Sequence, residues 1–369
     1  MHEVVHKKRI CSLILLLNVY LFVSADTIEY NPFYLGVRTY YGFIIPHSES
    51  IRSISYSRPR GVGIEAGWIA LGQRVWDHCF CYPRVGFNFY FTDFNNHDIL
   101  GRAYAMLFYV EPSFTVLRRM YLSYRFGMGI AFMDTPYDSI RNPRNLFYST
   151  YLSFPLQAAI SLNVRVTDRF VFRLGFHYEH ISNGGLKQPN KGINYPTAGI
   201  GVNYLVDKLM VPTRDKISHT LYPDFFQMNL VLSGTAKTIA NNESSRYFIY
   251  GLLLEVQKKI ARINALSVGT DVTIDYSLKE TLRRANLNDD YKRVGILTGH
   301  NLLIGRIVFY QKLGVYVYSP YKAKDPVYQR YGLLYRTTKN TSIGIDLKAH
   351  RHVADFLDVR LAYHFALTK

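Results

Sequence analysis

A histidine and a serine two residues apart close a strand pattern in the middle of the chain. Within 170–182, one alternating row of side chains is apolar and runs into His180 and Ser182, whereas Arg173 and Glu179 belong to the opposite row. Successive side chains of a β-strand point to opposite faces, so the imidazole and the hydroxyl share the apolar face. A serine hydroxyl becomes a strong nucleophile when a base removes its proton. This spacing indicates nucleophilic chemistry directed at an apolar substrate.

The loop after this strand is built from turn-forming residues. It contains Asn183-Gly184-Gly185 and Pro189-Asn190-Lys191-Gly192, and a second strand is expected over 197–206. Such residues form turns with or without catalysis, so the loop alone also fits an ordinary turn at a membrane surface. Asn194 continues the apolar even-numbered row of the second strand. It is therefore expected on the same face as His180 and Ser182.

Nearly the whole chain has the pattern of strands separated by turns. Hydrophobic residues make up 48% of it, with 31 Tyr and 23 Phe, yet no apolar run after residue 25 is long enough for a membrane-spanning helix. Glycines recur on the polar rows, as Gly127 and Gly129 do within 121–132, which favours a crowded barrel interior over a β-sandwich. The predicted fold class is all-β, a transmembrane antiparallel β-barrel of about 16 strands within a range of about 12 to 16.

Short and long connections alternate along the chain, as they do between the two sides of an outer-membrane barrel. The loop after His180 is a long one, which places this residue and Ser182 at the extracellular end. Residues 279–293 are expected to be a charged extracellular loop. His177 and Glu179 fall on the polar row and are expected inside the barrel. Tyr195 is expected in the interfacial aromatic belt.

The first 25 residues have the pattern of a signal peptide. A basic Lys7-Lys8-Arg9 precedes an apolar run over 10–23 and small residues before Asp26. This predicts export to the outer membrane of a Gram-negative bacterium. The remaining chain divides into 26–206, which carries the site, and 207–369, whose strands complete or extend the barrel. The basic connection over 206–224 is the plausible boundary, and the pattern leaves one barrel or two open.

Charge and cysteine content restrict the partners. The formal net charge is +17, and because the chain is expected to be exported, an anionic lipid surface is a better partner than nucleic acid. Cys79 and Cys81 lie on one side of any strand, so they are not expected to pair with each other. No convincing spacing of metal ligands is present, and neither a metal nor a cofactor is predicted.

The run His180-Ile181-Ser182-Asn183, followed by Asn190-Lys191-Gly192, resembles the lipid A 3-O-deacylase (PagL) family of outer-membrane β-barrel esterases. That family's signature is His-x-Ser-Asn, then Asn-x-Gly and an acidic residue. The resemblance implies that His180 is the general base and Ser182 the nucleophile. It also implies that Asn190 contributes to the oxyanion site, while Asn183 and Gly184 shape the turn. The likeness covers about 33–206, and the C-terminal half is an extension without a counterpart in the small eight-stranded members.

The sequence departs from the family at one catalytic position, where Asn194 replaces the acid. An amide oxygen can accept from the imidazole N–H and fix its tautomer, but it carries no charge to stabilise imidazolium. In serine proteases, replacing the aspartate of the catalytic triad by asparagine lowers turnover by about four orders of magnitude. Asn194 is nevertheless expected to be the third catalytic residue.

The predicted function is that of an outer-membrane esterase, which removes an ester-linked acyl chain from lipid A of lipopolysaccharide. A porin or transporter is the alternative of a different class, since sixteen strands in one barrel would enclose a channel. A catalytically weakened PagL-like barrel is another. A calcium-dependent phospholipase is a further enzyme class, but its calcium ligands are not evident. The acyl position that is cut and the oligomeric state stay open.

Overall fold

The computed structural model describes residues 30–215, 226–241, 243–321, 325–351 and 353–367. The expected signal peptide at 1–25 lies outside the described residues, as does 216–225 of the predicted connection. No helix in the described ranges is long and apolar enough to cross a membrane.

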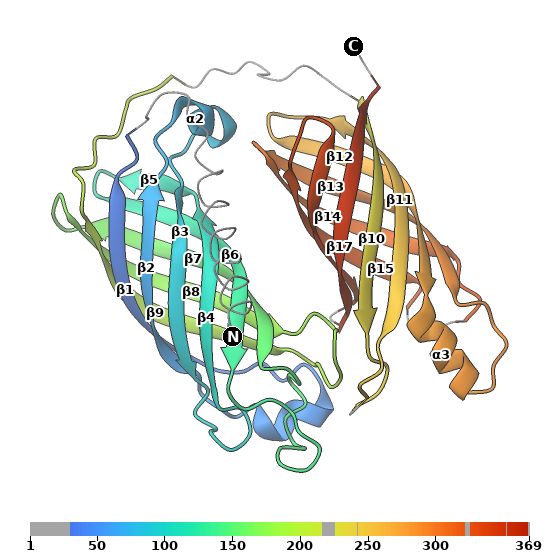
Figure 1. Cartoon of the computed structure of the whole chain (residues 1–369). Helices are drawn as coiled ribbons and strands as arrows, with labels where there is room; N and C mark the ends of the chain where they lie inside the picture. Colours follow the sequence, from blue (N-terminus) through green and yellow to red (C-terminus); the bar gives the residue numbers. More distant parts are fainter. Residues whose placement is uncertain (1–29, 216–225, 242, 322–324, 352, 368–369) are drawn as a thin grey trace, which may run out of the picture. The chain divides into compact units, whose positions relative to one another are not determined.

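The first part of the chain forms a closed, eight-stranded antiparallel barrel (Figure 1). Its sheet has the order β4-β3-β2-β1-β9-β8-β7-β6-β5, and pairing between β4 and β6 closes it. The short β5 pairs only along β6, outside the closed ring. The strands are β1 (Phe33–Gly42), β2 (Arg60–Ile69), β3 (Arg84–Asp93), β4 (Arg102–Glu111), β5 (Ser113–Leu117), β6 (Met120–Met133), β7 (Leu152–Arg165), β8 (Phe170–Ser182) and β9 (Ile193–Leu205).

The second part forms a closed barrel of its own, in which consecutive strands are neighbours and β17 pairs with β10. The all-β barrel class and the approximate number of strands are therefore confirmed, and the question of one barrel or two is answered in favour of two. The strands are β10 (Phe226–Lys237), β11 (Tyr247–Lys259), β12 (Asn264–Asp275), β13 (Lys292–Ile304), β14 (Ile307–Tyr318), β15 (Val327–Arg336), β16 (Thr341–His350) and β17 (Val353–Ala366).

Buried ion pairs occupy both interiors. In the first barrel, Arg173 contacts Glu65 at 3.0 Å and Glu111 at 2.5 Å. In the second, Arg330 contacts Asp271 at 2.8 Å. A barrel of eight strands is just wide enough for side chains to fill it. The porin alternative assumed one wide barrel of sixteen strands, and that premise is wrong.

In the described ranges, two α-helices and one 3-10 helix interrupt the strand pattern. They are η1 (Glu49–Ile54), α2 (Gln73–Cys79) and α3 (Tyr276–Arg284). After α2, Phe80 has a left-handed conformation with φ 52°, and Cys79 and Cys81 form a disulfide with a Cα–Cα distance of 5.1 Å. The expectation that they do not pair is wrong, because it assumed an extended strand, where the intervening residue cannot turn the chain.

Helix α3 lies partly in the segment that the sequence pattern assigned to an extracellular loop. The Asp275 side chain caps it by accepting from the Leu278 backbone N–H at 3.1 Å. Within the helix, Glu280 contacts Arg283 and Arg284 at 2.7 and 2.8 Å, which are favourable i,i+3 and i,i+4 pairs. The cap and these ion pairs explain why the chain turns from strand β12 into a helix at this point.

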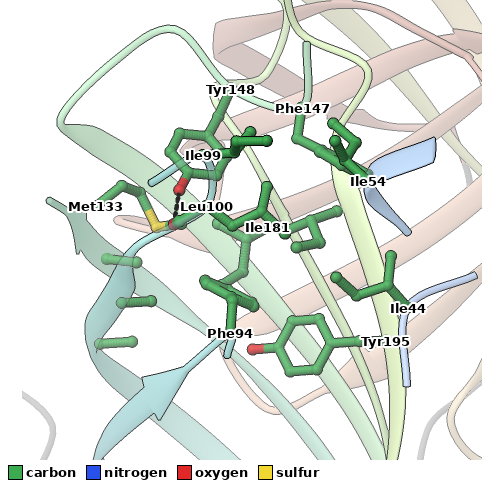
Figure 2. Packing of buried hydrophobic residues seen from close by; sticks show 14 of the residues in the cluster. Ile44, Ile54, Phe94, Ile99, Leu100, Met133, Phe147, Tyr148, Ile181 and Tyr195 are labelled. Carbon is green, nitrogen blue, oxygen red and sulfur yellow. Dashed lines mark hydrogen bonds between the residues drawn. The ribbon is translucent and has the colours of Figure 1, made fainter. Parts of the chain in front are cut away.

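A hydrophobic cluster packs beneath the long loops at one end of the first barrel (Figure 2). Ile181, Ile193 and Tyr195, at the ends of β8 and β9, are fully buried in it. Tyr195 packs edge-on against Phe94, with the ring centroids 5.6 Å apart. Its expected place in the interfacial belt is therefore wrong, because its odd position in β9 turns the ring inward. The cluster fixes the strand ends that carry the candidate site.

Candidate active site

The register of β8 and β9 brings the predicted site residues together. His180 and Asn194 are direct partners across the antiparallel pair, so their side chains are neighbours on one face. The even row of β8 faces outward, as Phe176 at 60% exposure and Tyr178 at 45% indicate. The odd row faces inward, and His177 and Glu179 are buried as expected. His180 and Ser182 continue the outward row.

A hydrogen-bond chain links the three predicted catalytic side chains. Ser182 Oγ lies 3.0 Å from His180 Nε2, and His180 Nδ1 lies 2.6 Å from Asn194 Oδ1. An amide oxygen only accepts, so His180 Nδ1 is the protonated nitrogen and donates to it. The neutral ring then presents Nε2 as an acceptor for the Ser182 hydroxyl. This arrangement can draw the proton from the serine.

Packing on the opposite face of β8 holds this geometry. Ile181 lies between His180 and Ser182 in sequence and is buried in the cluster of Figure 2, while Ser182 keeps 6% of its surface exposed. The two functional side chains are half-buried or buried, which limits their freedom to rotate. A preorganised nucleophile and base are expected to meet without a large reorganisation cost.

The turn after Ser182 supplies backbone donors beside the hydroxyl. The Gly184 N–H lies 3.4 Å from Ser182 Oγ, and this glycine has a φ of +65°, which a side chain would strain. The Asn183 N–H donates to Asn190 Oδ1 at 3.0 Å. This contact fixes the orientation of the Asn190 amide, whose Nδ2 points away from the Asn183 N–H. Asn183 Oδ1 accepts from the Gly185 N–H at 3.0 Å and thereby shapes the turn.

Gly192 permits the close approach of the imidazole. Its φ is +72°, and a Cβ at this position would lie 2.7 Å from His180 Cε1. Backbone N–H groups of Lys191 and Gly192 donate to the carbonyl oxygens of Leu146 and Phe147, at 3.0 and 2.8 Å. These bonds tie the loop to the β6–β7 connection. The Asn-x-Gly motif has glycine at this position because a side chain there would clash with the imidazole.

His47 is a member of the site that sequence reasoning missed. The segment after β1 continues the pairing with β9, because the Ile45 N–H donates to the Asn194 carbonyl at 2.9 Å. His47 Nε2 then lies 2.9 Å from the Lys191 carbonyl, and its Nδ1 lies 3.3 Å from Asn194 Nδ2. No local motif signals this residue, since only the pairing of β1 with β9 brings it to Asn194.

The loops around the site carry exposed positive charge. Arg144 and Lys191 are exposed and Lys187 is half-buried, and none of the three forms a salt bridge with another described residue.

Backbone N–H groups of Arg141 and the residue before it hold the pKa of Asp138 below its usual value. In the part of the chain that the structure describes, no group of three or more His, Cys, Asp or Glu side chains is arranged to hold a metal ion.

The same order of side chains occurs a second time, inside the second barrel. Ser342 Oγ lies 2.6 Å from His364 Nε2, and His364 Nδ1 lies 2.8 Å from Asn229 Oδ1. Here Ser342 has no exposed surface and Asn229 donates onward to Glu255 at 2.9 Å. These residues face the filled interior, where a substrate has no access. Of these two constellations of described residues, the one around Ser182 is the one on an outward strand row.

Comparison with family models gives two matches. Residues 62–203 match the model described as lipid A 3-O-deacylase (PagL), and residues 226–367 match the model described as acyloxyacyl hydrolase, C-terminal domain. Each of the two barrels thus matches one of these models. The chain is similar to the lipid A 3-O-deacylase (PagL) family of outer-membrane β-barrels, with an extended C-terminal half.

Solved structures show weaker likenesses. The crystal structure of the outer membrane enzyme PagL is 15% identical, with a TM-score of 0.34 over 45% of this chain and 97% of that one. Neisserial surface protein A is 14% identical, with a TM-score of 0.31 over 47% and 96%. The P. putida toluene transporter TodX is 7% identical, with a TM-score of 0.18 over 92% and 90%. A search of the curated proteins found no significant match. The similarity to the PagL family therefore rests on the two family models and not on these likenesses.

Proposed function

We propose that this protein is an outer-membrane esterase that removes an ester-linked acyl chain from lipid A. The observation that carries the proposal is the hydrogen-bond chain from Ser182 through His180 to Asn194 on the outward face of β8 and β9. It lies within the residues that match the PagL model. We further propose that the protein reaches the outer membrane of a Gram-negative bacterium through the signal peptide expected over 1–25.

In the first half of the reaction, Ser182 Oγ attacks the ester carbonyl carbon while its proton passes to His180 Nε2. The carbonyl oxygen becomes an oxyanion, for which the Gly184 N–H and the Asn190 Nδ2–H are the donors. The tetrahedral intermediate then expels the sugar hydroxyl, which takes the proton from His180. The product of this half is an acyl chain esterified to Ser182.

In the second half, a water molecule gives a proton to His180 Nε2 and attacks the acyl carbonyl. The second tetrahedral intermediate releases the fatty acid, and the proton on His180 returns to Ser182 Oγ. Asn194 Oδ1 holds the ring in the Nδ1–H tautomer throughout, so that Nε2 is always the nitrogen that exchanges protons.

The outer surface around the site suits a lipid substrate. Leu156, Phe176 and Tyr178 are exposed on neighbouring outward rows and offer an apolar track for acyl chains. The positive charges of Arg144 and Lys191 lie on the loops beyond the strand ends, where phosphate groups of lipid A would bind. Acyl chain and head group would thus be held on either side of the reacting ester.

A catalytically weakened barrel is the second candidate, and the neutral Asn194 is the observation that favours it. Orientation of His180 is retained, but the charge that would stabilise imidazolium is missing. A slow but measurable hydrolase is therefore expected, rather than the rate of a site with a carboxylate.

Mass spectrometry of lipid A tests the proposal. Cells that express the wild-type chain should lose one acyl chain from lipid A, and cells that express Ser182→Ala should not. Ser342→Ala is the matched control, because it removes the hydroxyl of the buried constellation, and its lipid A should resemble that of the wild type. Unchanged lipid A with the wild-type chain correctly inserted would refute the proposed function, as would equal loss with Ser182→Ala.

A further inference from the structure

His47 extends the hydrogen-bond chain of the candidate site by one member. Its Nε2 lies 2.9 Å from the Lys191 carbonyl, an atom that only accepts, so the proton of the neutral ring is on Nε2. Nδ1 is then an acceptor, and it faces Asn194 Nδ2 at 3.3 Å. The carbonyl of Ile45 is also near Nδ1, at 3.4 Å, but two acceptors do not bond to each other. The amide of Asn194 therefore has a partner at each end.

This second partner matters because an amide, unlike a carboxylate, has one accepting end and one donating end. If Asn194 turned over, its Nδ2 would face His180 Nδ1, which would then have to accept. The imidazole proton would move to Nε2, and Ser182 would face a donor instead of a base. Half of the possible amide orientations are thus unproductive.

We propose that His47 is a positioning residue that keeps the accepting end of Asn194 toward His180. The inference rests on the proposed function and deepens it, since it explains how a neutral residue serves in the acid position. His47 comes from the segment after β1, outside the residues that match the PagL model. It compensates for the asymmetry of the amide, a task that a carboxylate in the same place would not need.

Three substitutions with different hydrogen-bonding capacity test this role. His47→Gln keeps an acceptor and should retain kcat within about twofold of the wild type. His47→Leu offers neither donor nor acceptor, so the two orientations of the Asn194 amide should be equally populated. Because one of them is unproductive, kcat should fall about twofold. His47→Lys offers only donors and favours the unproductive orientation, so kcat should fall about tenfold, the value of one hydrogen bond. KM should stay constant, because none of these changes touches the substrate.

The same substitutions in an Asn194→Asp background separate positioning from general damage. A carboxylate accepts at both oxygens, so there is no orientation left to fix. In this background, His47→Lys should no longer lower kcat tenfold. The kcat of the double variant should equal or exceed that of the Asn194→Asp single variant. A loss of kcat that is the same in both backgrounds would overturn the proposal, and so would a loss in His47→Gln as large as in His47→Lys.

A spectroscopic measurement keeps the inference independent of turnover. In full-length protein with ¹⁵N-labelled histidine, the shifts of the His180 ring nitrogens report its tautomer. The wild type should have the proton on Nδ1, and His47→Lys should move it substantially to Nε2. If the wild type has no deacylase activity, the proposed function fails while this measurement still tests His47. If the protein is active but the His180 tautomer is the same in both, the positioning role is refuted and the function stands.

Discussion

Replacing Asn194 by aspartate should accelerate the proposed reaction, because the site has the geometry of a triad without its charge. The two side chains have nearly the same shape, and His180 Nδ1 already lies 2.6 Å from the oxygen that would become part of a carboxylate. The hydrogen bond is therefore kept, and only the charge changes.

The size of the effect follows from the charge separation. A carboxylate centred about 4 Å from the imidazolium charge gains about 4 kcal/mol at an effective dielectric constant of about 20. Loss of hydration of the half-buried carboxylate offsets part of this gain. A net stabilisation of the transition state by about 1.4 to 2.8 kcal/mol remains, which is about 10- to 100-fold in rate. This is less than the effect in serine proteases, because the neutral site already fixes the tautomer.

Release of fatty acid from purified lipid A in mixed micelles measures this effect, with single-turnover conditions isolating the acylation step. Asn194→Leu is the matched control, since it removes both the charge and the hydrogen bond and should fall well below the wild type. An unchanged or lower rate in a correctly folded Asn194→Asp variant would refute the reasoning that charge is what this site lacks.

Two further predictions concern the elements that support the structure. Ile181→Ala should destabilise the first barrel by about 2 to 5 kcal/mol in denaturant unfolding and lower kcat, because this side chain is fully buried beneath the site. Ile200→Ala, on the outer face of β9, is its control, and an equal loss from both would contradict the role of the cluster. Hydrogen bonds from Arg283 and then Arg284 lower the pKa of Glu280 to about 2. Because this folded-state pKa is depressed, the stabilisation of α3 is present above the unfolded value of about 4.3 and is lost as pH falls toward about 2. An NMR titration of the Glu280 carboxyl with a midpoint of about 4.3 would contradict this pH-dependent stabilisation of α3.

Period-two patterns predicted the barrel class well, because alternation of apolar and polar residues is a direct consequence of strand geometry in a membrane. They also predicted which face His180 shares with Ser182, since parity depends on one strand alone. The same patterns did not decide between one barrel and two, because closure depends on pairings such as β4 with β6 and β10 with β17, which are distant in sequence.

Other differences have local physical causes. Cys79 and Cys81 pair because a left-handed residue follows a short helix, a feature that alternation does not encode. Tyr195 lies in the interior because its parity follows that of Ile193, whereas its aromatic character suggested the interface. His47 escaped prediction since its contact with Asn194 spans the pairing of the first strand with the last strand of the first barrel.

Ser182 lies on the outward row of β8, in the wall of a filled barrel, and this position determines how a substrate would arrive. A lipid would never enter the protein, but would reach the serine by lateral diffusion within its own leaflet. The quantity that governs encounter is then the mole fraction of substrate in the surface, not its concentration in bulk solution. Diluting lipid A with inert detergent should slow turnover even when the total amount of both lipid and protein in the tube is unchanged.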